Sequence, residues 1–330
     1  MKYNQLGDSQ VKVSAITFGA WAIGGWMWGG SDKKDAVDAI HAAVDLGITS
    51  IDTAPIYGFG LSEELVGEAI AGKRQQVQLL TKYGMRWDSQ EGNLAFMSED
   101  ANGKEVPIHK FAGKKSVIKE CEDSLRRLRT DYIDLYQIHW PDVTTPISET
   151  MEAVAQLIQE GKVLAAGVCN YNAQQLAEAD KTLKQATDQV PYSMVERQIE
   201  EDVTPYCLEH GKGILAYSPL QRGLLTGKIT DDYKFEEGDH RPNTKHFRPE
   251  NRKQVNQFLD KIRPIADGYG VTLAQLVINW TIQQPAVAAA LVGARDPKQV
   301  KENAKALDFM LTGEEIKQIN TLLANVKLTA

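Results

Sequence analysis

Short apolar runs recur along the chain, and between them apolar residues return every three or four positions. The runs end at Phe18, Ile51, Thr81, Ile138, Val168, Val190, Tyr217 and Val292. Short apolar runs bounded by turn residues predict buried strands, whereas the longer stretches with a helical period predict helices that bury one face. Eight strands that alternate with helices predict the α/β class and a (β/α)8 TIM barrel.

The predicted helices carry start signals. Residues 172–175 and 312–315 fit capping boxes, in which the side chains at the two ends of the quartet each satisfy a backbone N–H of the other. Asp296 is followed by Pro297, which suits the first helical position because the N–H that proline lacks has no partner there. The local signals therefore agree with the alternation of strands and helices.

Three segments depart from this rhythm. Residues 3–6 and 11–14 flank the turn 7–10 and predict an N-terminal hairpin, which we expect to plug the barrel over the strand N-termini. The polar segments 83–115 and 221–251 are long for a compact domain, which is typical of binding loops, lids or small hairpin excursions. Because both follow strands, we expect both long loops on the C-terminal face of the strands.

The composition is that of an ordinary globular protein. The 330 residues are 42% hydrophobic and 25% charged, with no shift that marks a linker, so we expect a single domain over 1–330. A net charge of −7 argues against a general affinity for nucleic acid, which requires clustered Lys and Arg. The N-terminus has no signal-peptide pattern and no apolar stretch approaches the ~20 residues that span a bilayer. A cytoplasmic protein without a membrane segment is expected.

The cysteines and histidines do not indicate disulfides or metals. Cys121, Cys169 and Cys207 form no Cys-x-x-Cys pair, and the six histidines show no metal-binding spacing. We therefore expect no metal site. Three histidines of the two long segments are expected in solvent: His109, His240 and His246. Nothing in the sequence indicates an oligomeric state.

Ionisable side chains gather at the ends of three predicted strands. Asp52 and Tyr57 follow the second strand, Lys82 follows the third, and His139 follows the fourth. The carboxyl ends of barrel strands are where barrel enzymes place their chemistry. These four residues are therefore the first candidates for catalysis.

The chemistry of the four side chains fits one acid, Tyr57, supported by the other three groups. A phenol has a reference pKa of about 10, so a catalytic Tyr57 needs a neighbouring cation to stabilise its phenolate, and Lys82 can supply it. Asp52 is placed to compensate the charge of Lys82 at a strand end. His139 can donate a hydrogen bond to a substrate carbonyl oxygen.

Four segments of the chain carry a family resemblance: 52–64, 135–140, 161–170 and 216–220. On these segments the chain resembles the aldo-keto reductases over essentially its whole length. It is most similar to bacterial members with a Gly-Ala-Arg motif near the C-terminus, matched here by residues 293–295. The resemblance implies that Asp52, Tyr57, Lys82 and His139 are a catalytic tetrad, with Tyr57 as the acid in carbonyl reduction and the base in the reverse reaction.

The resemblance also implies a site for NADPH, since the chain has no Rossmann or P-loop glycine pattern. Tyr217 would stack on the nicotinamide ring, while Asn170 and Gln189 would hold its carboxamide. The other implied cofactor contacts are Ser218, Leu220, Gly223 and Lys228 for the pyrophosphate, Arg295 for the 2′-phosphate with Gly293 in the same motif, and Gln299, Glu302 and Asn303 for the adenosine end. Arg295 precedes the helix that starts at Asp296, so guanidinium and helix N-terminus could act together on a phosphate.

One position departs from the family pattern, because Cys169 stands where most relatives carry serine before the asparagine. A thiol is the weaker hydrogen-bond donor, so we expect looser anchoring of the nicotinamide. Plain structural roles remain open for three residues: Asn170 as a turn former, Tyr217 as a core aromatic, and Arg295 as a counter-charge to the helix it precedes.

An aromatic pocket is expected for the substrate. Trp21 and Trp140 are favoured as its walls over Trp26, Trp28 and Trp87. The predicted function is the reversible NADPH-dependent reduction of an aldehyde or ketone, with a small-molecule substrate that the sequence does not identify. The alternative is a redox-sensing regulatory subunit that binds NADPH, as some similar barrels serve channels. A short-chain dehydrogenase is excluded by the absence of Tyr-x-x-x-Lys.

Overall fold

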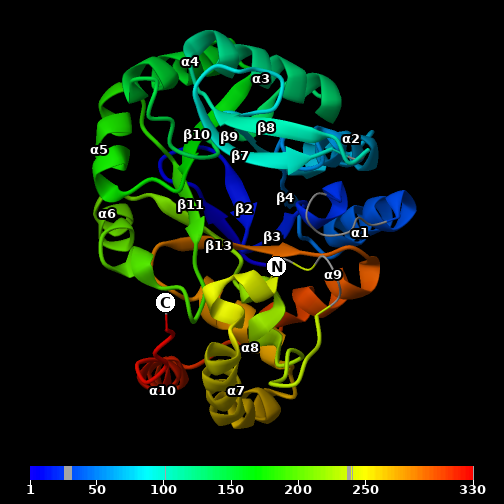
Figure 1. Ribbon diagram of the computed structural model, residues 1–330, viewed down its shortest axis with the longest axis vertical. Helices are drawn as coiled ribbons and strands as arrows, with labels where there is room; N and C mark the ends of the chain where they lie inside the picture. Colours follow the sequence, from blue (N-terminus) through cyan, green and yellow to red (C-terminus); the bar gives the residue numbers. More distant parts are fainter. Residues whose placement is uncertain (26–31, 101, 236–238, 240, 330) are drawn as a thin grey trace.

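The chain forms a closed barrel of eight parallel strands surrounded by helices (Figure 1). The computed structural model describes residues 1–25, 32–100, 102–235, 239 and 241–329. The barrel strands, in chain order, are β3 (Ile16–Gly19), β4 (Ser50–Asp52), β5 (Gln78–Tyr83), β9 (Ile133–Ile138), β10 (Val163–Cys169), β11 (Thr187–Pro191), β12 (Gly213–Tyr217) and β13 (Val287–Gly293). Strand β13 pairs with β3 and closes the barrel. The predicted fold is confirmed.

The strand ends predicted from the apolar runs agree with the structure. Seven of them coincide with or directly precede the last residue of a barrel strand, and only Thr81 stops short, since β5 continues to Tyr83. Strand β9 is buried along its whole length, as is β13 up to Val292. Such continuous burial is the reason why parallel strands read as uninterrupted apolar runs.

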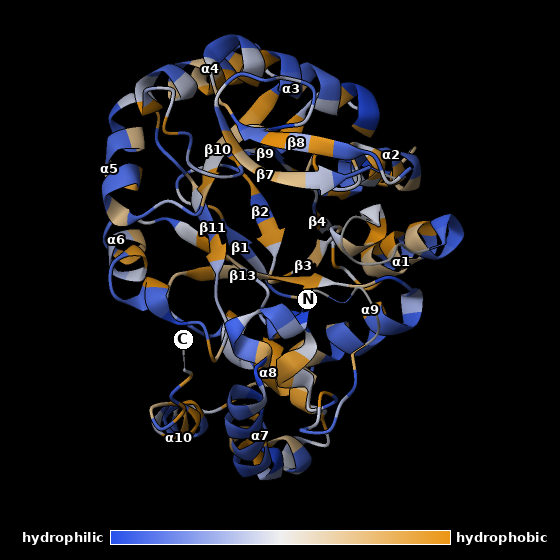
Figure 2. Ribbon diagram, viewed as in Figure 1, coloured by the Kyte–Doolittle hydropathy of each residue, from blue (hydrophilic) through white to orange (hydrophobic). Residues whose placement is uncertain are grey.

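Ten α-helices lie within the described residues. They are α1 (Lys33–Asp45), α2 (Leu61–Ala69), α3 (Lys114–Leu128), α4 (Ile147–Gln159), α5 (Ala173–Thr182), α6 (Val203–Glu209), α7 (Pro249–Tyr269), α8 (Leu273–Ile282), α9 (Pro297–Ala304) and α10 (Gly313–Leu323). Figure 2 shows apolar residues concentrated in the strands and polar residues along the outer helix faces. Helix α3 illustrates the pattern, because its buried residues recur at positions 117, 121, 124 and 128.

The predicted helix starts are confirmed. Asn172 and Thr312 form complete capping boxes, and the side chain of Asp296 accepts a hydrogen bond from the Gln299 backbone in front of α9. A further capping box, which the sequence analysis did not identify, opens α8 at Thr272. Each cap satisfies backbone N–H groups that the first helical turn leaves without partners.

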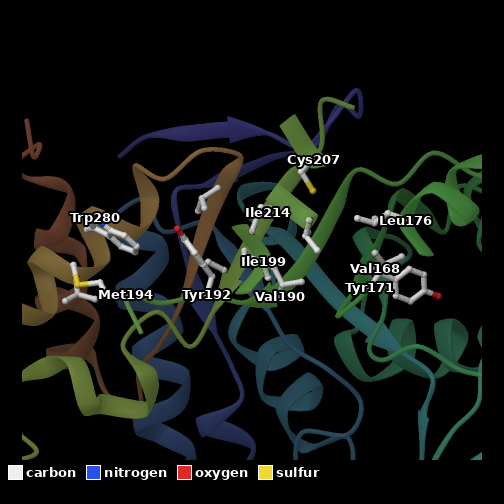
Figure 3. Packing of buried hydrophobic residues seen from close by; sticks show 14 of the residues in the cluster. Val168, Tyr171, Leu176, Val190, Tyr192, Met194, Ile199, Cys207, Ile214 and Trp280 are labelled. Carbon is white, nitrogen blue, oxygen red and sulfur yellow. The ribbon is translucent and has the colours of Figure 1, made fainter. Parts of the chain in front are cut away.

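A large apolar cluster fills the space between the strands β10 to β12 and their neighbouring helices (Figure 3). Trp280 of α8 is fully buried and stacks on Tyr192 with 5.8 Å between ring centroids. Burying an aromatic side chain of this size stabilises the fold by about 3 kcal/mol relative to leaving it exposed. The helices are thereby fixed against the strands whose ends carry the candidate residues.

The N-terminal hairpin closes the opposite end of the barrel. Strands β1 (Tyr3–Gln5) and β2 (Lys12–Ser14) pair antiparallel, as predicted. Leu6, Val11 and Val13 are buried in one cluster with barrel residues that include Leu80 and Leu135. A Cβ on Gly213, the first residue of β12, would lie 3.5 Å from Leu6. The hairpin therefore covers the N-terminal ends of the strands.

The segment after β5 is a small sheet, which matches the hairpin excursion, one of the three alternatives expected for it. Strands β6 (Met85–Arg86), β7 (Asn93–Glu99) and β8 (Glu105–Lys110) form an antiparallel sheet in the order β6-β8-β7. The sheet is tied to α3 by Arg86 of β6, which donates a hydrogen bond to the Ser116 hydroxyl and pairs with the Glu120 carboxylate at 3.8 Å. It therefore has a fixed place beside the strand ends.

The second long segment runs from β12 to α7 through short 3-10 turns, η4 (Gln221–Thr226), η5 (Arg241–Asn243) and η6 (Lys245–Phe247). The expectation of a solvated His246 is wrong, because this ring is buried with Nε2 2.9 Å from Glu196 Oε2. His109 is partly buried, and His240 lies outside the described residues. Across the described ranges, no helix combines the length and apolarity that crossing a membrane requires.

Candidate active site

A cavity of about 750 Å³ opens among the C-terminal ends of the barrel strands. Every one of the eight barrel strands contributes residues to its lining, either directly or through the loop that follows it. Met85 and Phe96 come from the small sheet after β5, and Tyr233 and Arg241 come from the segment after β12. The cavity is thus placed where a barrel enzyme keeps its chemistry.

Three of the four predicted tetrad residues meet at the floor of this cavity. Lys82 Nζ donates hydrogen bonds to Asp52 Oδ1 at 2.6 Å and to the Thr53 carbonyl at 2.9 Å. It also donates to the Tyr57 hydroxyl at 3.3 Å. The lysine is 1% exposed, so its charge acts at short range without screening by solvent. The phenol therefore points at a buried ion pair.

The turn that carries Tyr57 is fixed by several contacts. Gly58 adopts a φ of 67°, and a Cβ at this position would lie 2.1 Å from the Gly24 carbonyl oxygen. Ser62 follows on α2 and donates to the Ala20 carbonyl at 2.8 Å. Glu63 accepts from the Thr81 hydroxyl at 2.6 Å. The run 52–64 is therefore a folded unit that holds the phenol in place.

Burial decides the protonation of the Tyr57 hydroxyl. Burial raises its pKa to about 12, although the neighbouring Lys82 charge acts to lower it. The cation that the sequence analysis expected beside the phenol is present, but its effect on the pKa is smaller than that of removing the phenol from water. For Lys82, burial lowers the pKa, but the charges of Asp52 and Tyr57 outweigh this effect and raise it overall. At neutral pH the pair is a neutral phenol beside an ammonium ion.

His139 completes the predicted group. Its ring stands edge-on to the Tyr57 ring, with 5.7 Å between centroids and 82° between planes. Burial, followed by the Lys82 charge, holds the pKa of His139 well below its usual range. A neutral imidazole has one N–H donor, and its Nδ1 makes no hydrogen bond to the described part of the chain. The ring can therefore donate to, or accept from, a ligand oxygen in the cavity.

Asn170, Tyr217 and Gln189 lie together at the next part of the wall. Asn170 has a φ of 60°, donates to the His139 carbonyl at 3.1 Å, and accepts from the Tyr217 hydroxyl at 3.0 Å. Gln189 donates from Nε2 to Asp52 Oδ2 at 2.8 Å. The predicted nicotinamide contacts thus share hydrogen bonds with the predicted tetrad. Cys169 lines the cavity beside them and is almost fully buried.

The far part of the cavity is lined by residues predicted for phosphate and adenosine. They are Ser218, Leu220, Gly223, Lys228, Gly293, Arg295 and Gln299. Arg295 is exposed, and its guanidinium makes no ion pair or hydrogen bond with the rest of the described structure. Its backbone N–H donates to Gln299 Oε1 at 3.1 Å at the start of α9. An unpaired cation beside a helix N-terminus is a suitable place for an anion.

Glu302 and Asn303 lie on α9 but do not line the cavity. Glu302 pairs with Lys305 at 3.1 Å and accepts from Gln275 through its backbone carbonyl at 2.9 Å. Asn303 donates to the Gly293 carbonyl at 3.3 Å, which places it next to the rim. Neither side chain lines the cavity, although Asn303 contacts the lining residue Gly293.

Two cavity residues that the sequence analysis missed carry positive charge. Arg222 follows Leu220 by two positions, has a φ of 52°, and lines the cavity with its guanidinium unpaired in the described structure. Burial lowers its pKa despite the nearby Tyr217 hydroxyl. Arg241 reaches the cavity from the second long segment and donates to the Arg222 carbonyl at 3.3 Å. The position of Arg222 between Leu220 and Gly223, two implied pyrophosphate contacts, was a usable signal, whereas Arg241 lies in a stretch without periodicity.

The two favoured tryptophans both line the cavity. Trp21 lies 6.2 Å from Tyr57 between ring centroids, and Trp140 lies beneath the Lys110 ammonium at 4.9 Å. Trp87 instead packs edge-on against Phe59 behind the wall. Trp26 and Trp28 lie outside the described residues. Together with Met85 and Phe96, the two tryptophans make the space above the Tyr57 hydroxyl predominantly apolar.

The chain is similar in sequence to several known proteins over nearly its whole length. The chain is 41% identical to the aldo-keto reductase YhdN of Bacillus subtilis, over 98% of this chain and 94% of that protein. It is 37% identical to an NADH-specific methylglyoxal reductase of Escherichia coli, over 94% and 95% of the two chains. It is also 34% identical to a probable voltage-gated potassium channel subunit beta of Arabidopsis thaliana, over 94% and 92%.

Solved structures with a similar fold include further reductases and dehydrogenases. A glycerol dehydrogenase from Gluconobacter oxydans superposes with a TM-score of 0.88 at 40% identity, covering 98% of this chain and 95% of that chain. An aldo/keto reductase from Klebsiella pneumoniae, solved with NADP and acetate, gives 0.73 at 32% identity, covering 98% and 96%. The model of the aldo/keto reductase family matches residues 15–324. The barrel, the group at its floor and these matches lead to one conclusion: the chain belongs to the aldo/keto reductase family and is an oxidoreductase.

Proposed function

We propose that the protein reduces an aldehyde or ketone to an alcohol with NADPH, in a reversible reaction in which Tyr57 supplies the proton. The observation that carries this proposal is the neutral phenol of Tyr57, half-buried at the floor of a mostly apolar cavity and hydrogen-bonded by Lys82 at 3.3 Å. A reduced nicotinamide would supply the hydride. A carbonyl carbon that gains hydride and an oxygen that gains the phenol proton together give the alcohol.

Each residue of the tetrad has a distinct part in the proton transfer. Tyr57 holds a proton that it gives up only as negative charge develops on the carbonyl oxygen. Lys82 stabilises the phenolate that remains, and Asp52 keeps Lys82 charged and in place at 2.6 Å. His139, neutral in its half-buried site, orients the carbonyl oxygen by a hydrogen bond. In alcohol oxidation Tyr57 acts as the base, which requires the phenolate.

The chain offers fitting partners for a dinucleotide phosphate. Tyr217, Asn170 and Gln189 would hold the nicotinamide, with Cys169 as a weak donor beside them. Ser218, Leu220, Gly223 and Lys228 would hold the pyrophosphate, with Arg222 and Arg241 as additional cations. Among the described residues that line the cavity, Arg222, Lys228 and Arg295 are cations without an ion-pair partner, whereas Arg241 pairs with Asp239 and the one carboxylate, Asp52, pairs with Lys82. Such an excess of positive charge suits a ligand that carries several phosphates.

The choice of NADPH over NADH rests on Arg295. Its unpaired guanidinium at the start of α9 supports a contact with the 2′-phosphate, with Gln299 beside it. The methylglyoxal reductase relative is NADH-specific, so the preference is a property to be measured for this chain. Glu302 and Asn303 stand next to this region on the same helix, and we propose them as contacts of the adenosine end. We also propose the Gly-Ala-Arg motif of residues 293–295 as the mark of a bacterial subgroup.

The substrate class follows from the wall above Tyr57. Trp21, Trp140, Met85 and Phe96 present mostly apolar surface, which favours small carbonyl compounds with an apolar side. We further propose that the whole chain acts as one barrel domain, which the family match over residues 15–324 supports.

A second candidate is a regulatory subunit that senses the redox state of its nicotinamide cofactor, favoured by the likeness to the potassium channel subunit beta of Arabidopsis thaliana. A complete acid at the cavity floor favours the enzyme instead. Steady-state turnover of a panel of aldehydes, ketones and sugars with NADPH separates the two. Turnover of any of them well above the enzyme-free rate supports the reductase. Tight binding of NADPH with no turnover across the panel would favour the regulatory subunit.

A further inference from the structure

Gln137 occupies a place in the barrel interior where an apolar residue would be ordinary. It lies on β9 as the register partner of Lys82 on β5 and of Gly167 on β10. The side chain is fully buried. A Cβ on Gly167 would approach Gln137 Cγ to 3.1 Å and the Thr187 hydroxyl to 2.4 Å. The glycine thus leaves room for the glutamine side chain at this level of the barrel.

The Gln137 amide makes an incomplete set of hydrogen bonds. Its Oε1 accepts a long hydrogen bond from Gln189 Nε2 at 3.5 Å. Its own Nε2 is buried and has no partner in the described structure. A buried donor without a partner is destabilising, whereas a leucine or methionine here would leave no polar atom unsatisfied. A polar residue at this position therefore calls for a reason beyond packing.

The reason lies in the amide of Gln189. Two acceptors face its Nε2, namely Asp52 Oδ2 at 2.8 Å and Gln137 Oε1 at 3.5 Å. They exclude the reversed orientation, which would bring the amide oxygen of Gln189 against two other oxygens. Gln189 Oε1 accepts no hydrogen bond within the described residues, and Gln189 lines the cavity. The amide oxygen is thus available to a donor in the cavity.

We propose that Gln137 is a positioning residue that fixes the Gln189 amide, so that Nε2 stays on Asp52 and Oε1 is presented to the cavity as an acceptor for an amide N–H. This inference rests on the proposed function, in which that N–H belongs to the carboxamide of the nicotinamide. Without the acceptor of Gln137, Gln189 is held only through Asp52, and its oxygen loses its fixed direction. Gln137 itself does not touch the cofactor.

A pair of nucleotides tests this role directly, because they differ only at the carboxamide. NADP+ carries an amide N–H₂, and its 3-acetylpyridine analogue carries a methyl group in that place. Their dissociation constants are measured by titration calorimetry with wild-type protein and with Gln137→Met, which keeps the length of the side chain. We expect the wild type to bind NADP+ about fivefold more tightly than the analogue, the size of one hydrogen bond.

The variant should lose this discrimination, with both nucleotides bound about equally. Gln284→Met is the matched control: Gln284 is buried, donates to the Trp280 carbonyl at 2.8 Å, and does not line the cavity. It should keep the wild-type ratio. Thermal unfolding verifies that each variant is folded. If Gln137→Met does not fold, the two dissociation constants are measured with Gln137→Leu instead.

Two results would overturn the inference in different ways. If Gln137→Met and Gln137→Leu kept the wild-type ratio of dissociation constants, Gln137 would not position Gln189, while the proposed function would stand. If the wild-type protein bound neither nucleotide, the proposed function would fall, and the inference with it. A purely structural role would change the stability or both dissociation constants equally, and would leave their ratio unchanged.

Discussion

Lys82 Nζ donates a hydrogen bond to the Tyr57 hydroxyl over 3.3 Å, from a side chain that is 1% exposed. The two residues come from the third strand of the barrel and from the loop after the second, and barrel closure brings them together. An ammonium ion in this position stabilises a phenolate more than a phenol. In the proposed reaction the contact would act mainly when the proton leaves Tyr57, which is the condition for lowering a reaction barrier.

Removing the Lys82 charge should lower both stability and activity, and a second substitution at Asp52 should restore only the stability. Lys82→Met leaves Asp52 as a buried carboxylate without its ion-pair partner, which costs about 3–5 kcal/mol of unfolding free energy. Adding Asp52→Asn removes that unpaired charge, so most of the stability should return in the double variant. Turnover should stay about 100-fold or more below wild type in both, because the phenolate has lost its cation. Urea denaturation and steady-state kinetics measure the two effects. Recovery of turnover in the double variant would contradict the role given to Lys82.

The pH dependence of the two reaction directions should differ. Burial raises the pKa of Tyr57 to about 12, above the value of about 10 for an unfolded tyrosine. Reduction needs the phenol, so kcat/KM for a carbonyl should show no loss from Tyr57 ionisation between pH 6 and about 9. Oxidation needs the phenolate, so kcat/KM for the alcohol should rise with pH across the same range. Reduction that declines through neutral pH in step with rising oxidation would contradict the raised pKa.

The same shift bears on stability at alkaline pH. A folded pKa above the unfolded one means that the unfolded chain releases the Tyr57 proton first. The contribution of the neutral phenol to stability is therefore complete below pH 10 and declines as the pH rises towards 12. Tyr57→Phe has no such group, so its unfolding free energy should fall less steeply than that of the wild type above pH 10. Equal slopes in denaturation experiments at a series of pH values would count against the shift.

Arg295 should determine the choice between the two nicotinamide cofactors. Arg295→Ala should weaken the binding of NADPH by about 10- to 100-fold, the range of a hydrogen-bonded charge pair, and that of NADH by less than about threefold. Lys298→Ala is the matched control, because it removes an exposed cation from the same helix, α9, without reaching the cavity. Dissociation constants from fluorescence titration give the ratio. Equal weakening of both cofactors would mean that the 2′-phosphate lies elsewhere.

Gly58 should tolerate no side chain, because it carries Tyr57 on a turn pressed against Gly24. Gly58→Ala places a Cβ 2.1 Å from the Gly24 carbonyl oxygen at a φ of 67°. Gly72→Ala is the comparison, with a φ of 74° and no atom within 4 Å of its Cβ. Gly72→Ala should cost about 1–2 kcal/mol of unfolding free energy from backbone strain alone, and Gly58→Ala about 2 kcal/mol more. If urea denaturation gave the same loss of unfolding free energy for both variants, the turn at Gly58 would have moved to accommodate the added Cβ, contrary to the expectation.

The strands and the tetrad could be predicted from sequence for the same physical reason. A parallel strand buried on both faces is an unbroken apolar run, and polar side chains directly after such runs, as at Asp52 and Lys82, must meet at one end of the barrel. Helix caps such as Asn172 depend on a few neighbouring residues, so they too can be predicted from the sequence. Family resemblance added the cofactor positions, which no local pattern reveals.

Other parts of the site depend on the closed barrel and could not be predicted. Strand β7 exposes Leu94 and Met97 while Phe96 faces the cavity, so its sequence shows no clear alternation. The segment was expected beside the pocket, but Phe96 was not identified as one of its walls. The contact between Gln137 and Gln189 joins residues on strands that are not adjacent. The pKa of Tyr57 results from burial competing with Lys82, and the extent of burial is set only by the packed structure.

The central claim is that the Tyr57 hydroxyl delivers the proton, and Tyr57→Phe tests it by removing one oxygen atom. With the best substrate from the carbonyl panel, kcat should fall by about 100-fold or more, the usual contribution of a positioned acid, while the dissociation constant for NADPH stays within about threefold of wild type. Tyr132→Phe, which removes an exposed hydroxyl just ahead of β9, should leave both values unchanged. A Tyr57→Phe enzyme that binds NADPH normally and turns over at the wild-type rate would contradict the account.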